Sequence, residues 1–314
     1  MKVFCHVPRE SWFCDRYGQE YQEFSSHEVS SSSLSTDTNV IWLLAGWCWR
    51  QIDLRILSSK KVVCTIHHEV PWKFDNARRE EFLARDEFVD IYHVPCQQTE
   101  DFIRKITNKP VMQISYWANQ NLWKPLDRDE SKKKFDLGGK FVISSFQRDT
   151  EGSDLKTPKL EKGPDRFCDF VEKIRESTGK DVHVLLNGWR RQYVISRLEE
   201  SGIPYSYYEL PDIKEIVEMY CATDLYVVGS RVEGGPQSII ECALTKTPII
   251  STDVGIARNI LPAGCIINMD NDEYHAFIPE KKYVDQAYEN VQSLLIEDQV
   301  KKYDKLFSKV IEEL

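Results

Sequence analysis

Two glutamates, Glu233 and Glu241, stand eight positions apart on either side of a glycine turn. An apolar run at 225–228 precedes the turn, and a second one at 248–251 follows it. The pattern predicts the order strand, glycine turn, helix, strand. Backbone amides at the amino end of such a helix point beyond the strand end, where they can hold phosphate. The segment therefore predicts an anion site at the end of a strand.

The residues of the turn suit this role individually. Gly234 and Gly235 allow the backbone to approach a ligand closely. Pro236 fits the first helical position, where its missing N–H costs nothing. Gln237 and Ser238 then fall in the first helical turn. We expect all five to contribute to donor binding.

The two carboxylates would have different tasks. Glu233 precedes the helix, where it can reach a reacting group near the phosphates. Glu241 lies about one and a half turns into the helix. There it can accept hydrogen bonds from a diol such as that of a ribose. The alternative is a structural helix with a capping acid and a solvated Glu241.

Two cations bracket another loop between a strand and a helix. Arg148 follows the predicted strand 140–144, and Lys162 precedes the helix that starts near Asp165. A diphosphate leaving group needs two such cations when no metal is present. We therefore predict a phosphate clamp and no metal cofactor. The alternative is that both are ordinary solvated loop charges.

Three further strand ends carry candidate residues. His67 follows the predicted strand 61–66, where it could bind a sugar hydroxyl or position a backbone carbonyl. Its neighbours lack the helical spacing typical of zinc ligands. Asn187 and Gly188 follow strand 182–186 and could lie near a nucleotide base. Asp253 follows strand 248–251 and could approach the donor phosphates. For these last three, an ordinary turn is the alternative.

Two Asp-x-Asp triplets, Asp127-Arg128-Asp129 and Asp270-Asn271-Asp272, could in principle bind a metal. The first has no strand before it. The second leads into a predicted helix start, where acids favour the helix dipole. We interpret both as structural.

Bulk composition fits a two-domain globular protein of 314 residues with 41% hydrophobic and 11% aromatic content. The net charge of −9 argues against nucleic-acid binding by the whole chain. The charge is uneven: 19 Lys and Arg oppose 20 Asp and Glu through Gly138, and 22 oppose 30 afterwards.

The nine cysteines are scattered, with no Cys-x-x-Cys pair. This pattern favours buried thiols in a reducing compartment. The first residues predict a strand, not a signal peptide. We expect a cytoplasmic protein. Peripheral contact with a membrane stays open, because Lys132–Lys134 and the tryptophans Trp47, Trp49 and Trp72 lie in the amino half. The sequence does not indicate an oligomeric state.

Apolar runs alternate with helical patterns along the whole chain. Such alternation predicts an α/β protein with two doubly wound parallel sheets. The segment 121–140 is charged and reads as irregular, so we place the domain boundary at 138/139. The segment 29–39 reads as a serine-rich loop, and 264–267 as one further strand. Ligands of such sheets bind at the carboxyl ends of the strands.

The segment from Gly229 to Gly255 resembles the E-x7-E signature of retaining GT-B glycosyltransferases of family four, the glycosyl transferases group 1. Ser145–Gly163 resembles the phosphate-clamp region of that family. Ile114–Pro125 resembles the segment that leads into its domain linker, and His67 its amino-domain histidine. The sequence departs from the family in two places. Glu-Gly-Gly-Pro replaces the usual Glu-Gly-Phe-Gly, and the loop after the first strand lacks glycine before Gly18.

The resemblance implies a GT-B fold, with two Rossmann-like domains facing across a cleft. Residues 1–138 would form the acceptor domain and 139–314 the nucleotide-sugar donor domain, with terminal helices crossing back onto the first. Glu241 would hold the ribose, while Glu233, Arg148, Lys162 and His67 would serve catalysis. The acceptor would be a glycan, a lipid or another molecule. Two alternatives are a non-catalytic nucleotide-sugar binding subunit and a GT-B-like epimerase.

Overall fold

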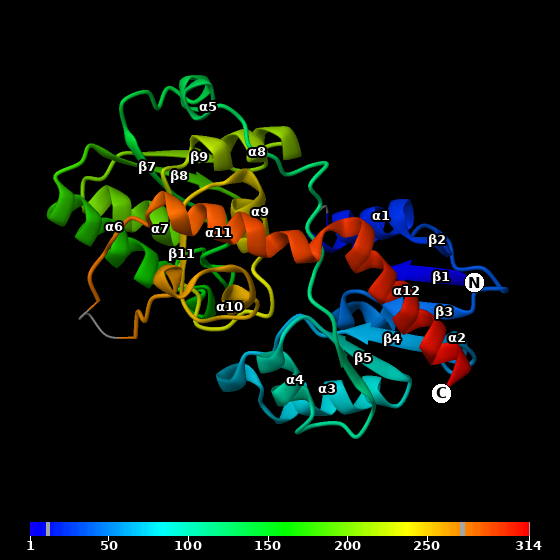
Figure 1. The fold of residues 1–314 in the computed structure, drawn as a ribbon. Coiled ribbons are helices and arrows are strands. Elements are labelled where there is room, and N and C mark those ends of the chain that lie inside the picture. Colours follow the sequence, from blue (N-terminus) through cyan, green and yellow to red (C-terminus); the bar gives the residue numbers. More distant parts are fainter. Residues whose placement is uncertain (11–12, 271–273, 314) are drawn as a thin grey trace. The chain divides into compact units, whose positions relative to one another are not determined.

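Two parallel β-sheets, one in each of two units, form the framework of the chain (Figure 1). The computed structural model describes residues 1–10, 13–270 and 274–313. Unit 1 comprises Met1–Trp117 and Leu294–Leu314, and unit 2 comprises Ala118–Ser293. The predicted α/β class with two doubly wound sheets is confirmed.

The six strands of unit 1 lie in the order β2-β1-β3-β4-β5-β6, and all of them pair in parallel. They are β1 (Lys2–His6), β2 (Glu28–Ser30), β3 (Val40–Leu43), β4 (Lys61–Thr65), β5 (Ile91–Val94) and β6 (Val111–Gln113). The helices of this unit are α1 (Phe13–Phe24), α2 (Leu54–Leu57), α3 (Asn76–Asp86), α4 (Gln97–Ile103) and α12 (Ile296–Glu312).

Side chains of β3 alternate between the two faces of this sheet, as strand geometry requires. Ile41 and Leu43 pack with Phe82 of α3 and Ile103 of α4 in one buried cluster. Trp42, between them, meets the α12 side chains Tyr303 and Phe307, at ring distances of 5.6 and 5.2 Å. Hence α3 and α4 cover one face, and α1 and α12 cover the other.

The helix α12 is fastened to unit 1 by buried polar contacts as well as by apolar packing. Asp304, 8% exposed, accepts hydrogen bonds from the Tyr21 hydroxyl (2.7 Å), the Ser25 hydroxyl (2.7 Å), and the amide (2.9 Å) and hydroxyl (2.7 Å) of Ser26. Gln299 donates to the Ser115 carbonyl at 2.5 Å. These contacts join the last helix of the chain to the carboxyl end of α1 and to the segment that follows β6.

The five strands of unit 2 lie in the order β11-β10-β7-β8-β9, again all parallel. They are β7 (Phe141–Ser145), β8 (Val182–Asn187), β9 (Tyr205–Tyr208), β10 (Leu225–Val228) and β11 (Ile249–Ser251). The helices are α5 (Arg128–Lys134), α6 (Pro164–Thr178), α7 (Gln192–Glu200), α8 (Ile213–Ala222), α9 (Gln237–Thr245), α10 (Ala257–Ile260) and α11 (Lys281–Val291). Ile143 packs with α6 and α7 on one face, and Val142 packs with α8 on the other.

The structure differs from the sequence prediction in the segment before β7. Residues 128–134, expected to be irregular, form α5, whose first turn is capped by the Asp127 side chain. This helix contacts α8, and Phe135 and Leu137 are buried with Met219 of α8. The segment 118–138 is therefore part of unit 2. The boundary lies at 117/118 instead of 138/139, because apolar side chains within the charged stretch find a core there.

Two shorter segments also differ from the prediction. Residues 28–30, of which the last two were expected to begin a serine-rich loop, form the edge strand β2, which pairs with β1. A strand of three residues is too short to show an alternating pattern. The segment 264–267 is not a regular strand. It begins with a short 3-10 helix, Ala263–Cys265, and makes one isolated bridge from Ile266 to Ser251.

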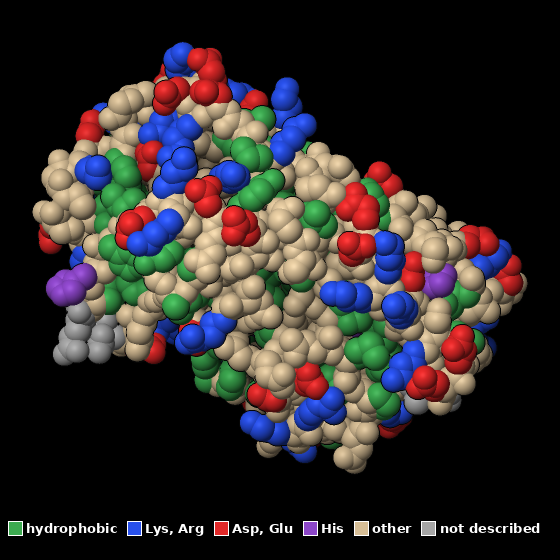
Figure 2. Space-filling model, viewed as in Figure 1, with side chains coloured by type: hydrophobic (Ala, Val, Ile, Leu, Met, Phe, Trp, Pro, Cys, Tyr) green, Lys and Arg blue, Asp and Glu red, His purple; other side chains and the backbone are tan. Residues whose placement is uncertain are grey.

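The surface carries both signs of charge. Figure 2 shows Asp and Glu interspersed with Lys and Arg over the viewed face, with no broad basic area. Among the residues described, no helix is both long and apolar enough to cross a membrane. All nine cysteines are free and buried.

Replacing Asp304 by Asn should destabilise unit 1 by about 2–3 kcal/mol, because an amide cannot accept all four hydrogen bonds and carries no charge. Burial alone would raise the pKa of Asp304, but the hydrogen bonds from Ser25, Tyr21 and Ser26 outweigh it, so the pKa is lowered. The contribution is therefore complete above about pH 4 and is lost as the pH falls through the folded-state pKa.

Urea unfolding at several pH values measures this effect. Asp298→Asn is the control, since Asp298 lies on the same helix but is exposed and pairs only with Lys301 in the described structure. An Asp304→Asn protein as stable as this control at pH 7 would contradict the prediction. So would a difference from wild type that grows instead of shrinking below pH 4.

Candidate functional site

The candidate site of unit 2 lies where the strand order reverses. From β7 the chain proceeds to β8 and β9 on one side, and then returns to β10 and β11 on the other side. In parallel sheets the loops that leave the carboxyl ends of two such strands diverge and open a crevice that binds ligands. Here those loops are 146–163, after β7, and 229–236, after β10.

The two loops are held against each other by a close backbone approach. Gly163 has a φ of 62°, and a β-carbon there would overlap the carbonyl group of Gly229. The carbonyl of Glu161 accepts hydrogen bonds from the amides of Arg231 (2.8 Å) and Val232 (3.2 Å). These contacts fix the amino end of α6 beside the end of β10.

Arg231 adds a side-chain clamp to the same junction. Its guanidinium donates to both carboxylate oxygens of Asp165, at 2.8 and 2.6 Å, and to the Leu160 carbonyl at 2.9 Å. Bidentate pairs of this kind fix geometry as well as adding energy. The loop before α6 and the loop after β10 are thus joined by backbone and side chains together.

Lys162 and Glu233, two of the predicted catalytic residues, meet at this junction. Lys162 Nζ lies 2.5 Å from Glu233 Oε1, and both side chains are largely buried. The Ser230 hydroxyl donates to the same glutamate oxygen at 3.4 Å. Gln147 donates to the Lys162 carbonyl at 2.7 Å, which links the start of the β7 loop to its end.

Positive charge gathers in the β7 loop. Arg148 donates through Nε to the Thr150 carbonyl at 2.9 Å. The pKa of Lys159 is lowered, first by burial and then by repulsion from the charges of Lys162 and Arg148. Lys159 immediately precedes the short 3-10 helix Leu160–Lys162, so all three cations belong to this one loop.

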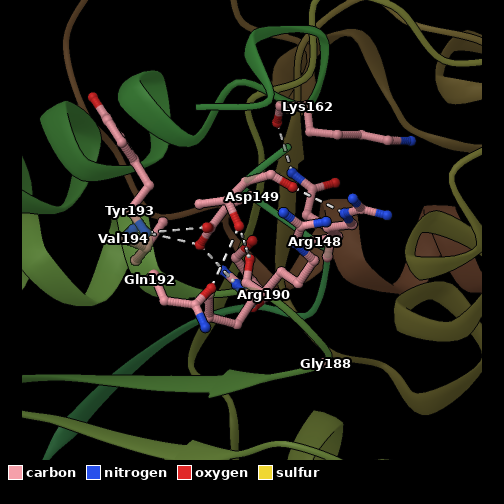
Figure 3. Close-up of polar contacts among 12 residues, drawn as sticks. Arg148, Asp149, Lys162, Gly188, Arg190, Gln192, Tyr193 and Val194 are labelled. Atoms are coloured by element: carbon pink, nitrogen blue, oxygen red, sulfur yellow. Dashed lines mark hydrogen bonds and ion pairs between the residues drawn. The ribbon is translucent and has the colours of Figure 1, made fainter. Parts of the chain in front are cut away.

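A fully buried ion pair forms the base of this loop. Arg191 Nε donates to Asp149 Oδ2 at 3.0 Å, and both side chains are 1% exposed. Asp149 also accepts from the amides of Tyr193 (3.3 Å) and Val194 (3.4 Å) in the first turn of α7. Figure 3 shows Asp149 beside Tyr193 and Val194, and the Lys162 side chain extending away from Asp149.

The glycine turn is shaped by a second close approach. Gly255, with a φ of 53°, packs so tightly on the turn that a β-carbon would overlap Gly234 and Gly235. The helix α9 begins at Gln237, so Pro236 is its N-cap instead of its first residue. The correction moves the helix start by one position and keeps the predicted order of turn and helix.

Two side chains of α9 are placed for ligand binding. Within the described part of the chain, the Gln237 side-chain nitrogen is buried and lacks a hydrogen-bond partner. Buried donors are normally paired, so this amide suits an acceptor oxygen of a ligand. Glu241 is 7% exposed and accepts a hydrogen bond from the Tyr220 hydroxyl at 2.7 Å. Burial, and after it the charge of Glu241, raises the pKa of Tyr220, which keeps this hydroxyl a donor.

The remaining predicted residues of unit 2 have other neighbours. The Asn187 side chain donates to the sulfur of Met219 at 3.8 Å. Gly188, with a φ of 93°, lies beside Phe146 at the start of the β7 loop. Ser238 is a hydrogen-bonding neighbour of Tyr226. Asp253 is exposed and forms an ion pair with Arg258 at 2.7 Å, as an ordinary turn residue would.

His67 belongs to unit 1, where it follows β4. Its Nε2 lies 2.8 Å from the Leu44 carbonyl, which can only accept, so this nitrogen carries the proton. Nδ1 then accepts from the Tyr116 hydroxyl. Of the two predicted roles, this geometry favours positioning of a backbone carbonyl over binding of a sugar hydroxyl.

The described residues contain no group of three or more His, Cys, Asp or Glu side chains placed to hold a metal ion. Asp127 caps α5, a contact that fits the structural interpretation of the first Asp-x-Asp triplet. In the second triplet, Asp270 accepts from Arg166, while Asn271 and Asp272 lie outside the described residues.

Sequence reasoning missed Lys159, Asp149, Arg191, Arg231 and Tyr220. A lysine three positions before Lys162 is a signal that could have identified Lys159. The Asp149–Arg191 and Arg231–Asp165 pairs join residues far apart in the sequence, and a single sequence contains no signal for them.

Comparison with known proteins identifies the carboxyl-terminal part of the chain. Residues 155–295 match the family of glycosyl transferases group 1. This range begins within the β7 loop and includes Lys162, the glycine turn and α9. Among curated proteins, no sequence matches significantly.

Solved structures of glycosyltransferases share the fold of the whole chain. HepE from Anabaena, solved with UDP and glucose, is 11% identical with a TM-score of 0.72, over 98% of this chain and 99% of that one. Sucrose-phosphate synthase from Thermosynechococcus elongatus is 18% identical with a TM-score of 0.68, over 97% and 80%. A UDP-forming trehalose-phosphate synthase from Burkholderia xenovorans is 12% identical with a TM-score of 0.61, over 89% and 75%. The chain therefore has the GT-B fold.

Replacing Gly163 by Ala should disrupt the junction of the two loops, because the new β-carbon has no room against Gly229. Gly179→Ala is a matched control. Its φ of 61° imposes the same backbone strain, but nothing lies within 4 Å of the added carbon. We expect about 1–2 kcal/mol of destabilisation for the control and clearly more for Gly163→Ala.

Urea unfolding of the two variants tests this prediction, with nucleotide binding as a second measurement. Equal losses of stability would contradict it, since strain from a positive φ would then account for the whole effect.

Proposed function

We propose that this chain transfers a sugar from a nucleotide-sugar donor to an acceptor, with retention of configuration and without a metal ion. The match of residues 155–295 to the glycosyl transferases group 1 supports this proposal. The observation that carries the proposal is the meeting of Lys162 and Glu233 at the switch point of a parallel sheet, among further cations.

The donor would lie over the carboxyl end of β10 with its ribose toward Glu241. In this position the carboxylate accepts hydrogen bonds from the ribose hydroxyls while Tyr220 holds its other side. The buried Gln237 amide and the turn Gly234–Pro236 would face the sugar and the distal phosphate. Binding of UDP by HepE, a protein of the same fold, supports a nucleotide in this crevice.

Departure of the diphosphate leaves negative charge on its oxygens, which fixed cations stabilise without reorganisation. Arg148 and Lys162 supply those cations, so the proposed reaction needs no Lewis acid. Glu233 holds the Lys162 ammonium at 2.5 Å and thereby orients it. Retention would follow from attack on the face that the diphosphate leaves, assisted by that phosphate, so no protein nucleophile is required.

Unit 1 would bind the acceptor at the carboxyl ends of its strands. His67 would act there as a positioning residue that fixes the Leu44 carbonyl and the Tyr116 hydroxyl. Nine buried free thiols fit a cytoplasmic enzyme. The acceptor class and any peripheral membrane contact are open parts of the proposal.

A panel of nucleotide-sugars in a thermal-shift assay should reveal stabilising donors, and the same ligands should be consumed in a transfer assay. Glu241→Ala should then weaken binding of the selected donor at least tenfold, because the ribose loses its acceptor. Glu241→Ala also leaves the Tyr220 hydroxyl unpaired. Donor affinity is therefore compared between Tyr220→Phe and the double variant Glu241→Ala/Tyr220→Phe, which both lack that hydroxyl.

Three results separate the candidate functions. The proposed donor site would be contradicted if no nucleotide-sugar stabilised the protein, or if the double variant bound the donor as tightly as Tyr220→Phe. Binding without transfer to any acceptor would identify a nucleotide-sugar binding subunit. A product that is the epimer of the donor would identify an epimerase.

Removal of Lys162 should reduce transfer at saturating donor about 100- to 1000-fold, as expected for a group that stabilises developing charge. The control is Lys140→Ala, which removes an exposed lysine paired with Asp181 in the same unit.

Addition of EDTA should leave the rate of the wild type unchanged. An EDTA-sensitive rate restored by a divalent cation would refute the proposal of metal independence.

A further inference from the structure

Within the loop after β7, the chain turns back on itself, so that two segments of the loop lie next to each other. Residues 149–159 form a small hairpin in which Thr150 bridges Pro158 and the Glu151 amide donates to the Thr157 carbonyl at 3.0 Å. At its base, the Lys159 amide donates to the Asp149 carbonyl at 2.7 Å. The hairpin therefore places Lys159 close to Arg148, although eleven positions separate them in the sequence.

Asp149 is the anchor of this arrangement. Its side chain is held by Arg191 and by the first turn of α7, and its amide donates to the Arg190 carbonyl at 3.1 Å. Arg191 in turn donates to the carbonyls of Ser145, at the end of β7, and Asn187 (2.9 Å), at the end of β8. The anchor is therefore tied to two neighbouring strands and a helix. It holds Arg148 through the chain and Lys159 through a hydrogen bond.

Among the described residues, no carboxylate is hydrogen-bonded to the Lys159 ammonium. Its nearest described carboxylate oxygen is that of Glu161, at 3.8 Å, beyond hydrogen-bonding distance. Glu233 already lies against Lys162. The hairpin closure at Asp149 and the contact of Gln147 with the Lys162 carbonyl bring the two ends of the loop together, so Arg148, Lys159 and Lys162 all lie at its base. The repulsion that lowers the pKa of Lys159 would be relieved by a bound diphosphate.

We propose that Lys159 is a third cation for the donor diphosphate, and that the buried Asp149–Arg191 pair is a positioning pair that holds it beside Arg148. This inference rests on the proposed function of the same site. Lys159, which the hairpin supplies, would be a further ligand-binding residue of that site. Its positioning would also explain why an aspartate and an arginine are both fully buried at the base of the hairpin. Burying an ion pair costs free energy of desolvation. A fully buried pair at this place is therefore consistent with a requirement for fixed geometry.

The structural alternative is that Lys159 only pairs with Glu161 and closes the hairpin. The two interpretations differ in what they predict for phosphates. A cation on the diphosphate should discriminate a nucleoside diphosphate from a monophosphate, whereas a hairpin contact should affect both equally. A contact with phosphate should also weaken as salt increases.

The test measures binding of UDP and UMP by titration calorimetry at two salt concentrations. Lys159→Ala should lower UDP affinity about tenfold and UMP affinity much less, with a weaker salt dependence for UDP. Lys156→Ala is the matched control, because Lys156 is exposed at the tip of the same hairpin and should change neither affinity. Lys159→Arg, which keeps the charge, should restore most of the UDP affinity.

The positioning pair is tested by a double-mutant cycle. Asp149→Asn should lower UDP affinity, and Lys159→Ala should have a smaller effect in the Asp149→Asn background than in wild type. Independent effects of the two changes would overturn the positioning role. Arg191→Lys keeps a positive charge beside the Asp149 carboxylate. It serves as the second variant if Asp149→Asn fails to fold.

The outcomes distinguish this inference from the function on which it rests. If wild type binds neither UDP nor UMP, the diphosphate and monophosphate of the base selected in the nucleotide-sugar panel replace them. Wild type without affinity for any nucleoside diphosphate would overturn both proposals. Normal UDP binding by Lys159→Ala, or equal losses for UDP and UMP, would overturn only the role of Lys159.

Discussion

The candidate site depends on the contact between two backbones at Gly163 and Gly229. A side chain at the first position would push the loop before α6 away from the end of β10. Lys162 lies one residue before this contact and Glu233 four residues after it, so their 2.5 Å approach is a consequence of it. The Arg231–Asp165 clamp and the two hydrogen bonds to the Glu161 carbonyl then hold the loops at that distance. A glycine in the sequence thus determines where two charged groups meet.

The sequence contained enough information for the fold and for half of the site. Strands with continuous apolar residues and helices with clear periodicity predicted both parallel sheets, and the glycine turn predicted the helix start at α9 to within one residue. The predictions failed where the determining contacts are distant in the sequence. Residues 128–134 look like a charged linker until α8 covers their apolar neighbours. Asp149 and Arg191 look like loop charges until the fold removes both from water.

Unit 1 shows how the role of a predicted site residue depends on contacts that the sequence does not reveal. A histidine at the end of a parallel strand lies at the edge where ligands bind. Whether its nitrogens are available is decided by Leu44 after β3 and Tyr116 after β6, which lie on other strands of the sheet. Both nitrogens of His67 are engaged, so its influence on a ligand would pass through those partners. The same unit fastens α12 through Asp304, a contact that no local pattern near residue 304 indicates.

The unusual turn Glu-Gly-Gly-Pro can be explained by the segment that packs against it. Gly255 leaves no space for a side chain between itself and Gly234–Gly235, so the shape of the turn is imposed from the loop after β11. An aromatic residue within the turn is then not needed to hold its conformation. Pro236 has no amide N–H to offer a phosphate, whereas the side-chain nitrogen of the adjacent Gln237 is a buried donor without a partner among the described residues. If the turn contacts the donor sugar as proposed, the Gln237 side chain is the group that would do so.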